Sequence, residues 1–366
     1  MKKQIPQLPN TPQPSPKQSP SRISLPAPLF LLIAAACVAL GFTGEFLWNG
    51  NYRSDTKKHS LIASHNSNET SDIYSYFHVQ RHTENKLTRP ILLYDFDKES
   101  QEMQELKSQL QSTLAGYQQK NILQNASVYV RDFSNSSWID INADETFHPA
   151  SLMKITILIY YLKQSESDPG ILNRRLVLNK DLQAPGQTFE EKNIKPGVQY
   201  TVNELLERMV ANSDNYATSL LDFQIDTNAL SQIFTELNIP KPVRPFSNYM
   251  LSTRDYSKLM RILYNASYLN ESNSEKALLL LTRSDFEQGI TNGLPKNITV
   301  AHKFGEYSLL PDAKELHESG IVYAGNKAYL LTIMTKGPDV KQLPQVLSTL
   351  SQQVYHYFSE AHPSKS

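Results

Sequence analysis

Cysteine is almost absent from this chain, since Cys37 is the only one among 366 residues. A single cysteine excludes an internal disulfide framework and any metal site built from several thiolates. An excess of charge is also lacking, because 36 lysines and arginines balance 36 aspartates and glutamates. A chain without net positive charge lacks the basic excess typical of proteins that bind a polyanion, and we therefore expect no nucleic-acid partner.

Charge is missing altogether from the run between Ile23 and Gly44. At about 1.5 Å per residue this run reaches roughly 33 Å, enough to cross a bilayer as a helix. We predict a transmembrane anchor over residues 25–48, after a disordered, basic cytoplasmic tail over 1–24. The rest of the chain is then extracytoplasmic and held at the cell membrane. A cleaved signal peptide would show a small-residue cleavage site after the run, and a lipid on Cys37 is disfavoured because apolar residues continue beyond it.

The remaining chain divides into two parts. Residues 49–89 are polar without apolar periodicity, which predicts a linker, and residues 90–366 carry the pattern of one globular domain. The pattern predicts terminal helices over 98–120 and 343–359, and strands over 126–133, 137–142, 297–306, 318–324 and 327–336. Strands near both ends with helices between them predict an α+β fold, in which both termini build one antiparallel sheet around an all-helical subdomain.

The segment HPASLMKITILIYYLKQ, residues 148–164, combines an apolar helix pattern with two polar residues one turn apart, Ser151 and Lys154. Its apolar residues leave no polar stripe, so the helix is central and an ammonium inside it is costly. The simplest interpretation makes Ser151 a helix cap and extends Lys154 to water. The pattern S-x-x-K alone is weak, since it recurs at Ser54 and Lys57 in a polar stretch.

Two further polar groups interrupt apolar patterns. Ser213, Asp214 and Asn215 break an amphipathic helix that opens with the capping box of Thr201 and Glu204. Three short polar residues of this kind ordinarily end a helix. The third group lies at the end of an apolar strand, in the sequence AHKFGE over 301–306, and by itself it is typical of an edge strand with a lysine.

The three groups together form an ordered signature. S-x-x-K, then S-D-N about 60 residues later, then Lys-x-Gly about 90 residues further on is typical of serine acyl-transferases that recognise penicillin. Residues 90–361, about three quarters of the chain, resemble class A β-lactamases and their penicillin-binding relatives. Within that group they are most similar to serine hydrolases of uncertain substrate that carry HKFGE and SGIVY. The resemblance implies the β-lactamase/transpeptidase-like fold.

The resemblance also implies roles for individual residues. Ser151 would be the nucleophile and Lys154 its base, which burial and the second cation Lys303 push toward the neutral form. Ser213 would relay the proton to the leaving group, while Asn215 holds the substrate and orients Lys154. The substrate-binding residues would be Lys303, Phe304, Gly305 and Glu306, with the backbone N–H groups of Ser151 and Glu306 as the oxyanion hole. This chemistry needs no metal or organic cofactor.

Three absences depart from the family pattern. Phe304 replaces the hydroxyl residue that helps to hold a substrate carboxylate, and no arginine follows Arg283 to hold it from another side. Residues 238–251 contain no acidic residue, although class A enzymes place there the glutamate that activates the deacylating water. We therefore expect slow release of the acyl group.

Three functions remain open. The first is a membrane-tethered hydrolase that acts on β-lactams or on D-alanyl peptides of the cell wall. The second is a module that senses such ligands without turnover, although a pure binder needs no activated nucleophile. The third is a Ser-His-Asp hydrolase using His148, which is disfavoured because G-x-S-x-G is absent. The sequence gives no indication of oligomeric state.

Overall fold

The computed structural model describes residues 77–82, 87–179, 188–189, 193–242, 249–308 and 313–359. All of them belong to one compact unit that spans residues 74–366. Within these ranges, no helix is both long enough and apolar enough to cross a bilayer. The predicted tail and transmembrane anchor, residues 1–48, lie outside the described residues, so the anchor stays a prediction.

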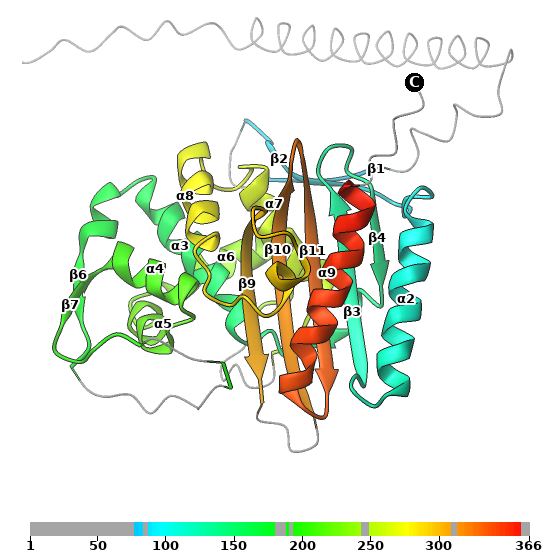
Figure 1. The fold of residues 1–366 in the computed structure, drawn as a ribbon. Helices are drawn as coiled ribbons and strands as arrows, with labels where there is room; N and C mark the ends of the chain where they lie inside the picture. The colour runs from blue at the N-terminus through cyan, green and yellow to red at the C-terminus, as the bar shows by residue number, and fades with distance from the viewer. Residues whose placement is uncertain are drawn as a thin grey trace, which may run out of the picture. The chain divides into compact units, whose positions relative to one another are not determined.

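A five-stranded antiparallel sheet forms the centre of the domain, with the strand order β4-β3-β11-β10-β9. Its strands are β3 (Asn125–Asp132), β4 (Trp138–Ile141), β9 (Thr299–Tyr307), β10 (Lys314–Ala324) and β11 (Lys327–Gly337). Strands from the two ends of the domain meet where β3 pairs with β11 (Figure 1). The prediction of one antiparallel sheet built from both termini is confirmed.

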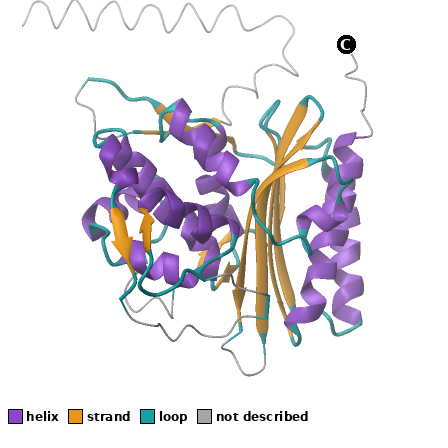
Figure 2. Cartoon of the chain, turned by 60° about the vertical axis from the view of Figure 1, so that its left-hand side comes forward, coloured by secondary structure: helices purple, strands orange, loops and turns teal. Residues whose placement is uncertain are grey.

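Helices lie on both faces of this sheet. Helices α2 (Gln104–Gln119) and α9 (Leu343–Ser359) cover one face, as Figures 1 and 2 show. Helix α7 (Thr253–Tyr264) packs on the other face. The helical subdomain beyond it contains α3 (Lys154–Ser165), α4 (Val202–Ala211), α5 (Asn215–Asp222), α6 (Thr227–Glu236) and α8 (Glu271–Leu281). Each face of the sheet therefore has its own apolar core, and the predicted helical insertion is confirmed.

Three small two-stranded sheets complete the described domain. They pair β1 (Phe77–Arg81) with β2 (Ile91–Phe96), β5 (Thr146–Phe147) with β8 (Leu251–Ser252), and β6 (Arg175–Val177) with β7 (Gln199–Thr201). Strand β1 lies inside the predicted linker, so the linker prediction is wrong for its last part. The pairing with β2 and a hydrogen bond of 2.9 Å between His82 Nδ1 and Glu236 Oε2 hold this stretch on the domain, and a polar composition alone does not show such contacts.

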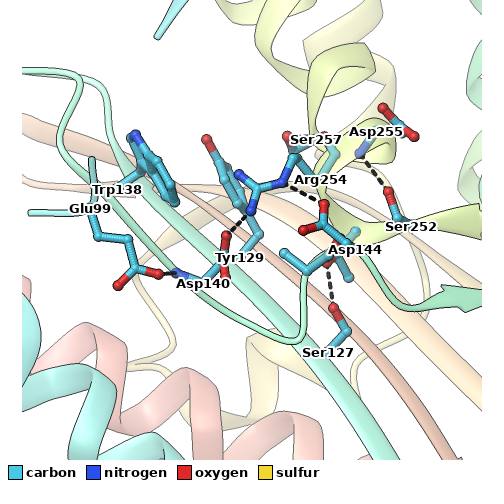
Figure 3. Close-up of polar contacts among 12 residues, drawn as sticks. Glu99, Ser127, Tyr129, Trp138, Asp140, Asp144, Ser252, Arg254, Asp255 and Ser257 are labelled. Atoms are coloured by element: carbon cyan, nitrogen blue, oxygen red, sulfur yellow. Dashed lines mark hydrogen bonds and ion pairs between the residues drawn. The ribbon is translucent and has the colours of Figure 1, made fainter. Parts of the chain in front are cut away.

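Arg254, in the first turn of α7, fastens that helix to the sheet (Figure 3). Its guanidinium is paired with Asp140 of β4 and, at 2.9 Å, with Asp144, and it lies 5.2 Å from the ring centre of Trp138. Burial raises the pKa of Asp140 although the arginine opposes this effect. The arrangement fixes the position of α7, and Tyr256 on this helix reaches the site described next.

Candidate active site

Ser151 lies in a short 3-10 turn, η2 (Ala150–Met153), directly before helix α3. Neither η2 nor α3 is capped by a side chain, so the interpretation of Ser151 as a helix cap is wrong. Ala150 has a φ of 47°, a conformation that costs an L-residue about 1–3 kcal/mol and is concentrated at functional sites. Tyr256 of α7 supports the turn, because its hydroxyl donates to the carbonyl of Leu152 at 3.1 Å. No hydrogen bond of the Ser151 hydroxyl is found among the described residues.

Lys154 is buried, with only 4 % of its surface exposed. The simplest interpretation of the sequence, in which the ammonium of Lys154 extends to water, is therefore wrong. The ammonium donates instead to the backbone carbonyl of Ser213 and to Asn215 Oδ1 at 2.8 Å, and lies 3.1 Å from Ser213 Oγ. The first two polar groups of the sequence signature therefore meet in one buried cluster.

Ser213 owes its position to the break between two helices. Helix α4 ends at Ala211, and Ser213 follows with a φ of 54°, the left-handed conformation that stops a helix. Asp214 then caps α5, because its carboxylate accepts from the backbone N–H groups of Tyr216 at 2.8 Å and Ala217 at 2.9 Å. Burial raises the pKa of Asp214, although these N–H groups oppose it. The predicted helix end is confirmed, and it aims the Ser213 hydroxyl at Lys154.

Lys303, on strand β9, also approaches Ser213. Its Nζ is fully buried, lies 3.1 Å from Ser213 Oγ and donates to the carbonyl of Phe304 at 2.9 Å. Gly305 allows the strand to come this close, because a Cβ there would lie 2.7 Å from the carbonyl oxygen of Pro149 and 3.0 Å from the nitrogen of Leu152. The third group of the signature thus joins the other two.

Phe304 and Glu306 contact residues 188–189, for which the sequence showed no link with the site. The ring of Phe304 stacks on Phe286 at 4.3 Å and meets Phe189 edge-on at 6.3 Å. The carboxylate of Glu306 accepts from the backbone N–H of Thr188 at 3.0 Å. A sequence gives no direct signal for such a contact, because backbone donors have no residue signature.

Sequence reasoning also missed Glu315, which is buried on β10 near η2, the nucleophile turn that carries Ser151. Glu315 accepts from the backbone N–H of His148 at 2.9 Å and lies 3.4 Å from His317 Nε2. Burial opposes its ionisation, yet His317 and His148 together lower the pKa of Glu315. The alternation of Glu315 and His317 about the apolar Leu316 was an available signal, but the predicted strand began only at residue 318.

The ring of His148 contacts Tyr307 and Glu315. It stacks on Tyr307 at 4.1 Å, and its Nδ1 lies 3.4 Å from Glu315 Oε1. The geometry therefore gives no support to a Ser-His-Asp arrangement. Two further histidines, His78 and His82, are four residues apart and lie on and beside strand β1. The described residues contain no group of three side chains suited to a metal ion.

A cavity of 560 Å³ opens beside Ser151. Ser151, Lys154, Asn215 and Glu306 line one end of it, and it continues between helices α3, α5 and α6. This volume is in the range of small-molecule sites. Among the residues with described positions, a nucleophilic hydroxyl, a buried amine and an amide thus converge on a space that can hold a substrate.

Comparisons with known proteins concern the family and the fold of the chain. The model of the β-lactamase enzyme family matches residues 105–358. The structure of PBP-A is similar, with 26% sequence identity and a TM-score of 0.60, over 70% of this chain and 97% of that one. A PBP-A mutant solved as an acyl-enzyme complex with penicillin G is also similar, with 25% sequence identity and a TM-score of 0.60, over 71% of this chain and 98% of that one. A β-lactamase from Sphaerobacter thermophilus shares the fold at 18% identity and a TM-score of 0.60, over 70% and 99%. No curated protein matches the chain.

Proposed function

This chain belongs to the β-lactamase enzyme family, and we propose that it is a serine hydrolase that forms an acyl-enzyme through Ser151, with β-lactams or D-alanyl peptides as acyl donors. One observation carries the proposal. Ser213 Oγ lies 3.1 Å from both Lys154 Nζ and Lys303 Nζ, so a hydroxyl connects the two buried amines. A module that only binds its ligand needs no such arrangement, and the sensing alternative is therefore not favoured.

In the proposed acylation step, Lys154, Ser213 and Lys303 have separate roles. Lys154 in its neutral form takes the proton of Ser151 as the hydroxyl attacks the acyl carbon, and the second ammonium nearby disfavours the charged form of Lys154. The proton then passes through Ser213 to the leaving atom, while Lys303 keeps the Ser213 hydroxyl in place. The backbone N–H groups of Ser151 and Glu306 stabilise the oxyanion, and Gly305 allows these two segments to lie close together.

Deacylation is the slow step in this proposal. Among the described residues that line the cavity, the carboxylates are Asp222 and Glu306. Asp222 lies seven residues along α5 from Asn215, about 10 Å away along the axis. The carboxylate of Glu306 already accepts a hydrogen bond from the backbone N–H of Thr188. Neither carboxylate is placed to activate a water on the acyl group, and a missing general base costs about 10² to 10⁴ in rate.

Labelling with a fluorophosphonate probe tests the identity of the nucleophile. The probe needs an activated serine and no particular substrate, so the wild-type protein should be labelled and Ser151→Ala should not. Ser54→Ala is the matched control, because it alters the other S-x-x-K sequence, and its labelling should equal that of the wild type. Undiminished labelling of Ser151→Ala would overturn the proposed function.

A further inference from the structure

The cavity beside Ser151 has an apolar interior. Beyond the polar end, its apolar wall includes Ile157 of α3, Leu230 and Phe234 of α6, and Tyr249. Thr156, Thr218 and Ser219 also line the cavity, but their hydroxyls donate to backbone carbonyls of their own helices or caps. Ile157 is 8 % exposed and Phe234 only 1 %, so both side chains are held in the core, and neither carries a polar group that could bind a substrate. A hydrocarbon or aromatic group is the chemistry that fits such a wall.

The position of Ser213 decides which half of a substrate enters the cavity. Ser213 and Lys303 do not line it, whereas Ser151 and Lys154 do. In the proposed reaction the leaving group takes its proton from Ser213 and so departs on the side of Ser213 and Lys303. The acyl group, on the other side of the scissile bond, points into the apolar cavity.

The charged groups around the cavity disfavour an acyl group with a carboxylate. Lys154 and His148 are the basic side chains among its described lining residues. Lys154 already donates to Ser213 and Asn215, and His148 stacks on Tyr307 and lies beside the carboxylate of Glu315. Asp222 and Glu306 add negative charge to the wall. An anion that entered would therefore lose its hydration without gaining a counter-ion, which is strongly unfavourable.

We infer that this site selects esters and amides with an uncharged, apolar acyl group, and that Leu230 and Phe234 determine this preference. The inference rests on the proposed function. In the reaction, Ser151 Oγ forms a bond to the acyl carbon and the bond from that carbon to the leaving oxygen or nitrogen breaks. The serine proton passes through Lys154 and Ser213 to the leaving group, and water later releases the acyl group as a carboxylic acid.

The test uses the full-length protein and p-nitrophenyl esters, whose release of p-nitrophenol in a single turnover reports acylation. From acetate to butyrate to octanoate the acylation rate should rise, by roughly two- to fourfold for each of the first buried methylenes. Hexanoate should react at least tenfold faster than the mono-ester of adipate, which has the same chain length and a terminal carboxylate. Equal rates across the chain series, or a faster adipate ester, would overturn the inference.

Substitutions in the cavity wall test whether Leu230 and Phe234 determine the preference for apolar acyl groups. Leu230→Trp should fill the cavity and remove the advantage of octanoate over acetate. Leu279→Trp is the matched control, because Leu279 is 51 % exposed on α8, and it should keep the wild-type chain-length profile. If Leu230→Trp does not fold, Phe234→Leu provides a milder change of the same wall, and an unaltered profile there would also overturn the inference.

Ser151→Ala separates this inference from the proposed function. Release of p-nitrophenol that survives in Ser151→Ala would show that the proposed nucleophile is wrong. Release that depends on Ser151 but shows no preference for apolar acyl groups would leave the proposed function standing and refute the inference alone.

Discussion

The Nζ of Lys303 lies 3.1 Å from the hydroxyl oxygen of Ser213, and the Nζ of Lys154 lies at the same distance from that oxygen. The three residues come from β9, from the junction of α4 and α5, and from the first turn of α3. The relay therefore depends on the packing of the sheet against the helical subdomain. Any change that separates these elements should impair acylation before it unfolds the domain.

Lys154→Arg tests whether Lys154 acts as a base. An arginine keeps the positive charge and can donate hydrogen bonds, but it cannot give up its proton near neutral pH. Labelling of Ser151 by the fluorophosphonate should therefore slow by about 10² to 10⁴. Rapid labelling, with a thermal unfolding midpoint like that of the wild type, would show that another group activates Ser151.

Gly305→Ala should separate β9 from the nucleophile turn. The added Cβ would lie 2.7 Å from the carbonyl oxygen of Pro149, and relieving this clash requires a displacement of the backbone. We expect acylation to fall by about 10² or more, the effect of losing an oxyanion donor, together with a loss of stability of roughly 1–3 kcal/mol.

Gly116→Ala is the control for this substitution. Gly116 lies inside α2, where an added Cβ would meet nothing within 4 Å. Alanine favours the helix by about 0.5–1 kcal/mol, so the protein should be slightly more stable with unchanged acylation. Equal acylation rates in Gly305→Ala and Gly116→Ala would contradict the close approach of β9 and the nucleophile turn.

Glu315 should make the domain sensitive to acid. Its pKa is lowered in the folded protein, so its contribution to stability is fully present above the unfolded value near 4.5 and is lost as the pH falls through the folded value. Glu315→Gln should remove this part of the pH dependence, and urea unfolding at pH 6.5 and 3.5 measures it. The exposed carboxylate of Glu105 offers a control, since Glu105→Gln should keep the wild-type acid response. An unchanged response in Glu315→Gln would contradict the assignment.

Membrane attachment remains a proposal from the sequence. We propose that residues 25–48 span the membrane with the N-terminus in the cytoplasm and the hydrolase domain outside. Protease added to spheroplasts should then digest the chain beyond residue 49 and leave the N-terminal tail protected. Recovery of the intact domain inside protease-treated spheroplasts would contradict this topology.

The sequence predicts those parts of the site whose residue types are themselves informative. Ser151, Lys154, Ser213 and Lys303 form a signature, and the helix break at Ser213 follows from short polar residues. The sheet and the final helix follow from apolar periodicity.

Contacts between distant backbone and side-chain groups leave no such pattern. The hydrogen bond from the Thr188 N–H to Glu306 and the pairing of β1 with β2 could not be predicted for that reason, whereas Glu315 and His317 did leave a signal in their alternation about Leu316. The apolar cavity was equally hidden, because its wall combines residues from separate helices that a sequence pattern assigns only to the core.

The most direct test of the account is the intact mass of the full-length protein during exposure to penicillin G and after removal of the excess. The account predicts a slowly formed adduct of one penicillin per chain, located on Ser151, that persists after the excess is removed and is absent from Ser151→Ala. A protein that turns penicillin G over rapidly without accumulating the adduct, or an adduct on another residue, would contradict it.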